Sequence, residues 1–142
     1  MNTLTAELLP ARTPAVVAAV GFVVLAAFQV ALALGAPLGR AAWGGTHVQL
    51  PTGLRVASAF AAAVWVLAAL TVLGRSGFSA SPLPPAFVRW GTWILVGVLV
   101  LGALMNFASP SGWERFLWGP AALILAVLCL VVARSGATPP GG

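Results

Sequence analysis

The side chains that could do chemistry in this chain are few, and their types limit what that chemistry can be. Among its 142 residues there are two acids, Glu7 and Glu114, one histidine, His47, and one cysteine, Cys129. A bis-histidine haem needs two histidines and a thiol–disulfide pair needs two cysteines, so the sequence excludes both kinds of redox centre. One His, one Cys and one nearby Glu give no spacing typical of a metal site. We therefore expect no catalytic residues, no metal site and no cofactor, and we predict that the chain is not an enzyme.

A small set of polar residues could still form a binding site near the ends of apolar segments. Polar groups at such depth usually face other helices and hydrogen-bond across them. Two interpretations stay open: polar contacts that fix the register of the helices, or an outward-facing vestibule that accepts a small polar or anionic ligand. The candidate polar cluster comprises Gln29, Arg40, Arg55, Asn106, Glu114 and Arg115.

Glu114 is the acid whose surroundings are most informative. Ser111 and Glu114 form the pattern S-x-x-E, which predicts a capping box at a helix start. We also predict that Glu114 pairs with Arg40 or Arg55. Arg115 is a poorer partner, because adjacent residues on a helix point about 100° apart. Glu114 lies outside the middle of a span, which argues against a proton-coupled exporter that depends on a buried glutamate.

Four long apolar stretches must position these residues. They cover residues 14–36, 54–74, 88–108 and 115–133, and the charged residues within them are arginines at their ends. A helix of about 20 residues, rising about 1.5 Å per residue, can cross a hydrocarbon layer about 30 Å thick. We predict an all-α fold, a four-transmembrane-helix bundle over residues 14–134. A polar lead (1–13) would precede the bundle, and a flexible tail (135–142) would follow it.

Local signals predict details of the helices. Thr13 can cap the first helix, with Pro14 at its first position, and Pro120 predicts a kink in the last one. Trp65 lies in the middle of the second span among small residues, so we expect it to pack against protein in the most enclosed helix. The other five tryptophans lie near span ends, as in an interfacial belt: Trp43, Trp90, Trp93, Trp113 and Trp118.

Composition and charge identify the environment. Hydrophobic residues make up 61% of the chain and charged residues 6%, whereas a soluble domain carries about 25% charged residues. We therefore expect the lipid bilayer to be its main partner. The net charge of +5 comes from arginines at the ends of apolar runs, where they anchor helices at lipid headgroups. This placement accounts for the positive charge without nucleic-acid binding, which we do not expect.

The arginines also predict an orientation. An even number of spans places both termini on one side of the membrane. Four arginines lie on that side and three on the other: Arg12, Arg75, Arg89 and Arg134 against Arg40, Arg55 and Arg115. The positive-inside rule then predicts a multi-pass protein of the cell membrane with both termini in the cytoplasm.

Two segments carry a resemblance to a known group of proteins. Residues 35–45 read GAPLGRAAWGG and are followed by LPTGLR at 50–55, and residues 106–115 read NFASPSGWER and are followed by WGP at 118–120. Together they resemble small bacterial four-helix integral membrane proteins of unassigned function. The resemblance extends over nearly the whole chain, from Pro14 to Arg134. It implies the four-span topology, but it assigns no activity and no functional residue.

Two functions remain open at this stage. The leading one is a non-enzymatic structural or accessory membrane component, acting with another membrane protein or as a homo-oligomer. The alternative is a small-solute carrier or channel that uses an outward-facing polar vestibule. A water-filled cavity reaching past Gln29 would favour the carrier, whereas a dry, closed bundle would favour the accessory role.

Overall fold

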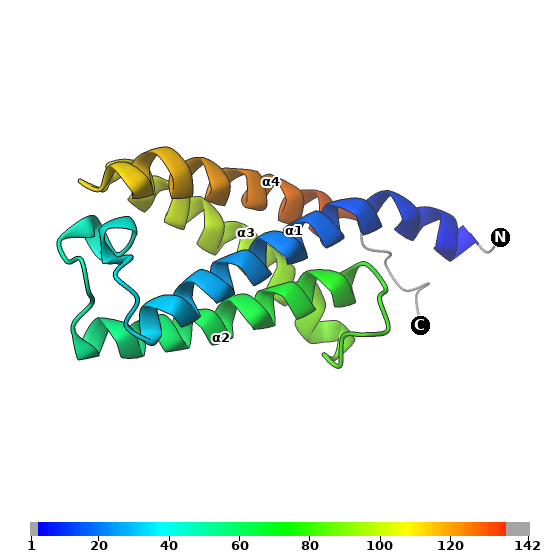
Figure 1. Ribbon diagram of the computed structural model, residues 1–142. Helices are drawn as coiled ribbons and strands as arrows, with labels where there is room; N and C mark the ends of the chain where they lie inside the picture. Colours follow the sequence, from blue (N-terminus) through cyan, green and yellow to red (C-terminus); the bar gives the residue numbers. More distant parts are fainter. Residues whose placement is uncertain (1–2, 136–142) are drawn as a thin grey trace.

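The computed structural model describes residues 3–135, with side chains from residue 11 onward. Within this range the chain is helical and contains no strand, which confirms the predicted all-α fold of four long helices (Figure 1). The long helices are α1 (Thr3–Ala33), α2 (Thr52–Arg75), α3 (Pro85–Ala108) and α4 (Gly119–Ser135). Three short helical segments lie in the connections: η1 (Gly39–Ala41), η2 (Trp43–Gly45) and η3 (Glu114–Trp118). Of the predicted flexible tail, Ser135 belongs to α4 and residues 136–142 lie outside the described residues.

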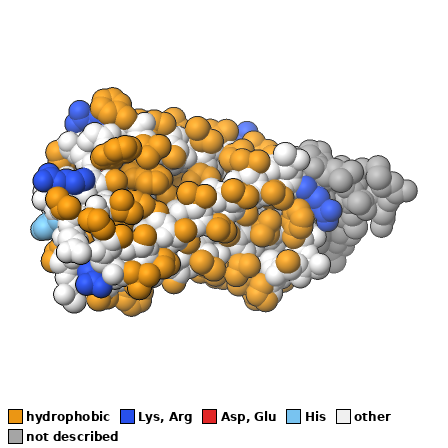
Figure 2. All heavy atoms as spheres, viewed as in Figure 1, with side chains coloured by type: hydrophobic (Ala, Val, Ile, Leu, Met, Phe, Trp, Pro, Cys, Tyr) orange, Lys and Arg blue, Asp and Glu red, His pale blue; other side chains and the backbone are white. Residues whose placement is uncertain are grey.

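Among the described residues, four helical segments are long and apolar enough to cross a membrane: Ala11–Ala33, Thr52–Arg75, Pro85–Ala108 and Glu114–Ser135. Large hydrophobic side chains cover the outer surface of the bundle; Phe60 and Phe116, for example, are 72% and 77% exposed. Figure 2 shows these side chains along the length of one face, with arginines mainly towards the two ends. An apolar surface of this extent suits contact with lipid rather than water. The fold is compatible with a polytopic membrane protein.

The four helices are arranged as two hairpins. One hairpin is formed by α1 and α2, and the other by α3 and α4. Between the hairpins, α1 contacts α4, and α2 contacts α3. We call the end where α1 stops and α2 begins the loop end, because η1, η2 and η3 lie there. The opposite end, where α2 stops and α3 begins, is the terminal end. The two hairpins are closer together near the terminal end and diverge towards the loop end (Figure 1).

The main hydrophobic core lies towards the terminal end and the middle of the bundle. Small residues of α1 and α2, such as Ala15, Ala18 and Ala68, allow the helices to approach closely. Trp65 is partly buried against this core and stacks on Phe22, with ring centroids 5.6 Å apart. The largest fully buried apolar side chains of this core are Phe22, Leu99, Val72, Val132 and Cys129. Leu32 is also fully buried, but it lies under the loop at the other end.

Two expectations about the first two helices are wrong. α1 begins at Thr3 and passes through Pro14 as helix, so Thr13 is not its N-cap. The segment before Pro14 also contacts the end of α2, where the side chain of Ser76 donates a hydrogen bond to the carbonyl of Ala11 (3.3 Å). α2 is also not the most enclosed helix, since its span is one-third buried, as in α1 and α4 (33% each).

The predicted kink at Pro120 takes the form of a π-helical turn. η3 covers the five residues before α4, and the N–H of Gly119 donates to the carbonyl of Glu114, an i→i−5 bond. Proline has no N–H to donate, so an ordinary α-helical ladder would be interrupted at this place. The π turn contains one residue more than an α-helical turn. This extra residue rotates the side chains that precede it by about 100° around the helix axis, relative to those of α4. Glu114 lies at the start of this turn.

Candidate functional site

The connection between α1 and α2 folds back over the loop end of the bundle. Leu32, Ala42 and Leu50 form a small buried cluster beneath it. Trp43, Gly44 and Gly45 all have positive φ angles (53°, 82° and 70°). Glycine adopts such angles freely, whereas a tryptophan rarely does.

Two indole groups hold this connection in place. The Nε1–H of Trp43 donates to the hydroxyl of Ser58 on α2 (3.0 Å), and that of Trp118 donates to the carbonyl of Ala41 (2.8 Å). These two tryptophans therefore fix the loop to α2 and to η3. The remaining three of the predicted belt are exposed on the outer surface: Trp90, Trp93 and Trp113.

The carboxylate of Glu114 is the polar centre of the loop end. Glu114 is 9% exposed. Its two oxygens accept the N–H of Gly44 (3.1 and 3.2 Å), and one of them also accepts the hydroxyl of Ser109. The N–H of Glu114 donates to the hydroxyl of Ser111 (3.4 Å), as the capping box predicts. The reciprocal bond is absent, because the N–H of Ser111 donates to the hydroxyl of Ser109 instead (3.1 Å).

The prediction that Glu114 pairs with Arg40 or Arg55 is wrong. Within the described part of the chain Glu114 forms no ion pair, and its partners are the uncharged groups just named. The Nε–H of Arg55 donates to the carbonyl of Ala33 (2.9 Å), the last residue of α1. Arg40 is exposed, and its carbonyl accepts the hydroxyl of Ser111 (2.9 Å).

Three of the arginines, Arg55 among them, bind carbonyls at helix C-termini, because these carry carbonyls without intrahelical partners and a partial negative charge. Arg115 follows the same rule at the end of α3, where one of its terminal N–H groups donates to the carbonyl of Ser109 (2.8 Å). At the terminal end Arg75 donates to the carbonyl of Ala133 near the end of α4 (2.9 Å). The positive charge is thus used to join neighbouring helices.

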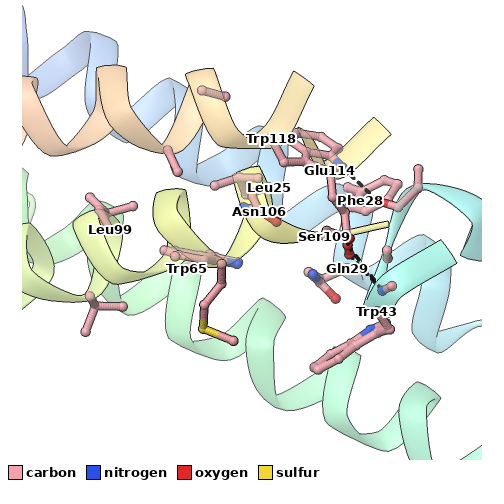
Figure 3. A pocket seen from close by; sticks show the side chains of 18 of the residues that line it. Leu25, Phe28, Gln29, Trp43, Trp65, Leu99, Asn106, Ser109, Glu114 and Trp118 are labelled. Carbon is pink, nitrogen blue, oxygen red and sulfur yellow. Dashed lines mark hydrogen bonds between the residues drawn. The ribbon is translucent and has the colours of Figure 1, made fainter. Parts of the chain in front are cut away.

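A cavity of about 610 Å³ lies beneath the loop, between the two hairpins. Trp43 and Gly44 border it at the loop end, and its deeper walls are apolar. It reaches past Gln29 to Leu25, which is one helical turn, or about 6 Å, further from the loop end. Trp65 and Leu99 line its deepest part (Figure 3).

The structure brings together three residues of the candidate polar cluster. Gln29, Asn106 and Glu114 come from three different elements, α1, α3 and η3, and all line the cavity (Figure 3). The Oε1 atom of Gln29 is buried and has no hydrogen-bond partner in the described part of the chain. The other three members do not line the cavity: Arg40, Arg55 and Arg115.

Sequence reasoning missed the residues that complete the site. Ser109 binds Glu114, Gly44 donates to it, and Trp43 and Trp118 form part of the cavity wall. The available signals were the Trp-Gly-Gly triplet at 43–45 and the Ser-Pro-Ser triplet at 109–111. Each is typical of a turn, but neither indicates that the two turns meet.

Comparisons with protein families, with curated proteins and with solved structures found no match to this chain. The interpretation of the site therefore rests on its own residues. The described residues contain no group of three or more His, Cys, Asp or Glu side chains that could hold a metal ion. What the arrangement offers is an apolar cavity with hydrogen-bond acceptors at one end.

Proposed function

We propose that this chain is a non-enzymatic membrane protein that binds a small molecule with an apolar body in the cavity at its loop end. The observation that carries the proposal is the cavity itself, which reaches past Gln29 and has the size of a ligand pocket, roughly 300–1,000 Å³. Protein interiors are normally close-packed, so a bundle with a purely structural role has no reason to keep such a space. Polar groups from three elements at one end of it would fix the orientation of a ligand.

The same geometry favours binding over passage through the membrane. Below the cavity the core is filled by fully buried side chains, among them Phe22, Val72 and Val132. A carrier or channel would need these helices to separate. The polar groups of the cavity also offer no histidine or cysteine to act with Glu114, which supports a binding role rather than catalysis.

The proposal includes an orientation. The arginines at the terminal end outnumber those at the loop end by four to three, so the positive-inside rule places the terminal end in the cytoplasm. The cavity would then lie in the outer half of the cell membrane. A ligand from outside the cell, or from the outer leaflet, could reach it.

Two glycines of α3 provide a matched test. A Cβ atom added at Gly97 or at Gly102 would meet no atom within 4 Å, so both positions can take a larger side chain. Only Gly102 of the pair lines the cavity. Gly102→Leu should therefore obstruct part of the cavity, whereas Gly97→Leu should leave it open.

Tryptophan fluorescence can report binding. Trp43, Trp65 and Trp118 line the cavity, so replacing the three tryptophans that do not line it (Trp90, Trp93 and Trp113) by phenylalanine leaves reporters at the site alone. In nanodiscs an ω-brominated dodecanol should quench this protein saturably. Gly97→Leu should bind the dodecanol as tightly as the parent does. Gly102→Leu should bind it about tenfold more weakly, which corresponds to a loss of about 1.4 kcal/mol in binding free energy.

Equal, unsaturable quenching in the parent, Gly97→Leu and Gly102→Leu would overturn the proposal. Such quenching would come from probe dissolved in the bilayer and not from probe bound in the cavity. Because Gly102→Leu could alter the packing of α3, Ala122→Val provides a second obstruction from α4. If both cavity variants keep their helix content by circular dichroism and bind like the parent, the cavity is not the binding site.

A further inference from the structure

The carboxylate of Glu114 lies at the polar end of the cavity and has acceptor positions that lack donors. The two oxygens of Glu114 share one N–H, from Gly44, and one hydroxyl, from Ser109. A carboxylate has about four acceptor positions, so some of them remain for another donor. A ligand that completes this arrangement must bring more than one hydrogen-bond donor.

The charge of the site is also incomplete. Two of the arginines at the loop end are used elsewhere, since Arg55 donates to the carbonyl of Ala33 and Arg115 to that of Ser109. Burying a carboxylate without a cation costs free energy, even when uncharged groups donate to it. A positively charged ligand group near Glu114 would offset this cost.

The deeper walls of the cavity suit an alkyl chain. Leu25, Trp65 and Leu99 surround its inner part. An alkyl chain that moves from lipid into these surroundings gains little free energy, because both environments are apolar. The contacts of the head group therefore decide which molecule binds.

The cavity reaches the outer surface of the bundle along α3. Val98 and Met105 line it and are nevertheless 47% and 67% exposed. The side between α1 and η3 is closed by the rings of Phe28 and Trp118, whose centroids are 5.0 Å apart. α3 packs closely against α4 and less closely against α2, which favours an opening to lipid between α2 and α3.

From these observations we infer that the ligand is a single-chain amphiphile with a primary ammonium head, which enters from the bilayer between α2 and α3. This inference rests on the proposed function of the cavity. The ammonium group supplies both the positive charge and the hydrogen-bond donors for the carboxylate of Glu114, and the alkyl chain occupies the deeper part.

The test compares ω-brominated dodecyl probes that differ in the head group alone: primary ammonium, trimethylammonium, alcohol and carboxylate. They are titrated into nanodiscs holding the protein whose tryptophans are Trp43, Trp65 and Trp118. The primary ammonium should bind about tenfold more tightly than the alcohol, because a charge-assisted hydrogen bond is worth about 1.5–3 kcal/mol. Trimethylammonium keeps the charge but has no N–H, so it should bind more weakly than the primary ammonium. The carboxylate should be the weakest of the four.

Glu114→Gln provides the matched variant. It should lower the affinity for the primary ammonium about tenfold and the affinity for the alcohol by a smaller factor, so that the preference for the ammonium is lost. Saturable quenching by the alcohol in this variant shows that the cavity is intact. Saturable binding of the alcohol without any preference for the ammonium overturns this inference and leaves the proposed function standing. If no probe binds saturably, both fail.

The route has its own test by stopped-flow quenching with the primary ammonium probe. Val98→Phe narrows the opening, whereas Leu101→Phe adds the same ring at a position that is exposed and does not line the cavity. Association should be slower in Val98→Phe and unchanged in Leu101→Phe. Equal association rates in both variants would reject entry between α2 and α3.

Discussion

The N–H of Gly44 donates to both carboxylate oxygens of Glu114, at 3.1 and 3.2 Å, although 70 residues separate them in the chain. This contact joins the α1–α2 connection to the turn between α3 and α4. A second bond beside it, from the hydroxyl of Ser111 to the carbonyl of Arg40, has the same effect. Polar bonds between turns thus hold the hairpins together at the loop end, where the cavity takes the place of helix packing.

Glu114→Gln should lower the free energy of unfolding by about 1–2 kcal/mol, because it replaces charge-assisted hydrogen bonds by neutral ones. Thermal unfolding in detergent, followed by circular dichroism, measures the change. Arg134→Gln, at an exposed position of the terminal end, should melt like the parent. If Glu114→Gln also melts like the parent, the carboxylate has no role in stability beyond that of any polar residue at a helix start.

Gly45→Ala should destabilise the protein by about 1–2 kcal/mol for the positive φ alone. The added Cβ would also lie 2.9 Å from the carbonyl oxygen of Arg40 and 2.9 Å from the Cβ of Ser111. Gly53→Ala is the control, since its Cβ meets nothing within 4 Å and alanine favours the first turn of α2 by about 0.5–1 kcal/mol. In the same melting experiment the midpoint of Gly45→Ala should fall below that of the parent, and the midpoint of Gly53→Ala should rise above it. Equal midpoints would contradict the described loop conformation.

Trp118→Phe should cost about 0.5–1.5 kcal/mol, because it removes the indole donor and leaves the carbonyl of Ala41 without it. The phenyl ring can still contact Phe28. Trp113→Phe serves as the control at an exposed position and should have no measurable effect on chemical denaturation in detergent. Equal midpoints for the two variants would show that the indole bond contributes nothing.

Cys129 should react with N-ethylmaleimide only after unfolding, because its side chain is fully buried (0% exposed) among core residues of all four helices. A cysteine introduced by His47→Cys, on the exposed loop, should react in the native protein and gives the rate for an open site. Mass spectrometry of the labelled chain measures both. Labelling of the two cysteines at similar rates in the native state would contradict the packed core.

Single cysteines on a Cys129→Ala background test the orientation. His47→Cys reports on the loop end and Ser79→Cys on the turn between α2 and α3. An impermeant maleimide applied to intact cells should label the first directly and the second only after permeabilisation. The reverse pattern would reject the proposed orientation, and labelling of both from one side would reject the four-span topology.

The sequence was sufficient for the fold because four apolar runs of membrane-spanning length allow few other interpretations. It was less informative about the position of each helix in the bundle, since lipid-facing and core-facing residues are equally apolar in a membrane. Val98 and Leu99 are adjacent and both aliphatic, yet one is exposed and the other fully buried.

The candidate site was predicted in part for a related reason. Gln29, Asn106 and Glu114 stand out because polar residues are rare near apolar runs, and the structure does bring them together. The partners of Glu114 could not be predicted, because the charge of an arginine gives no indication that a helix C-terminus will engage it first. The positive φ of Trp43 likewise could not be predicted, and its indole bonds to Ser58, a residue fifteen positions away.

The position of the core towards the terminal end has a consequence for the motions of the bundle. Side chains such as Val72 and Val132 fill the space between the hairpins there, whereas a few hydrogen bonds between turns connect them at the loop end. Local opening requires less free energy where few buried contacts must separate. The amplitude of thermal fluctuation should therefore increase along each helix from the terminal end to the loop end, and amide hydrogen exchange should follow the same gradient.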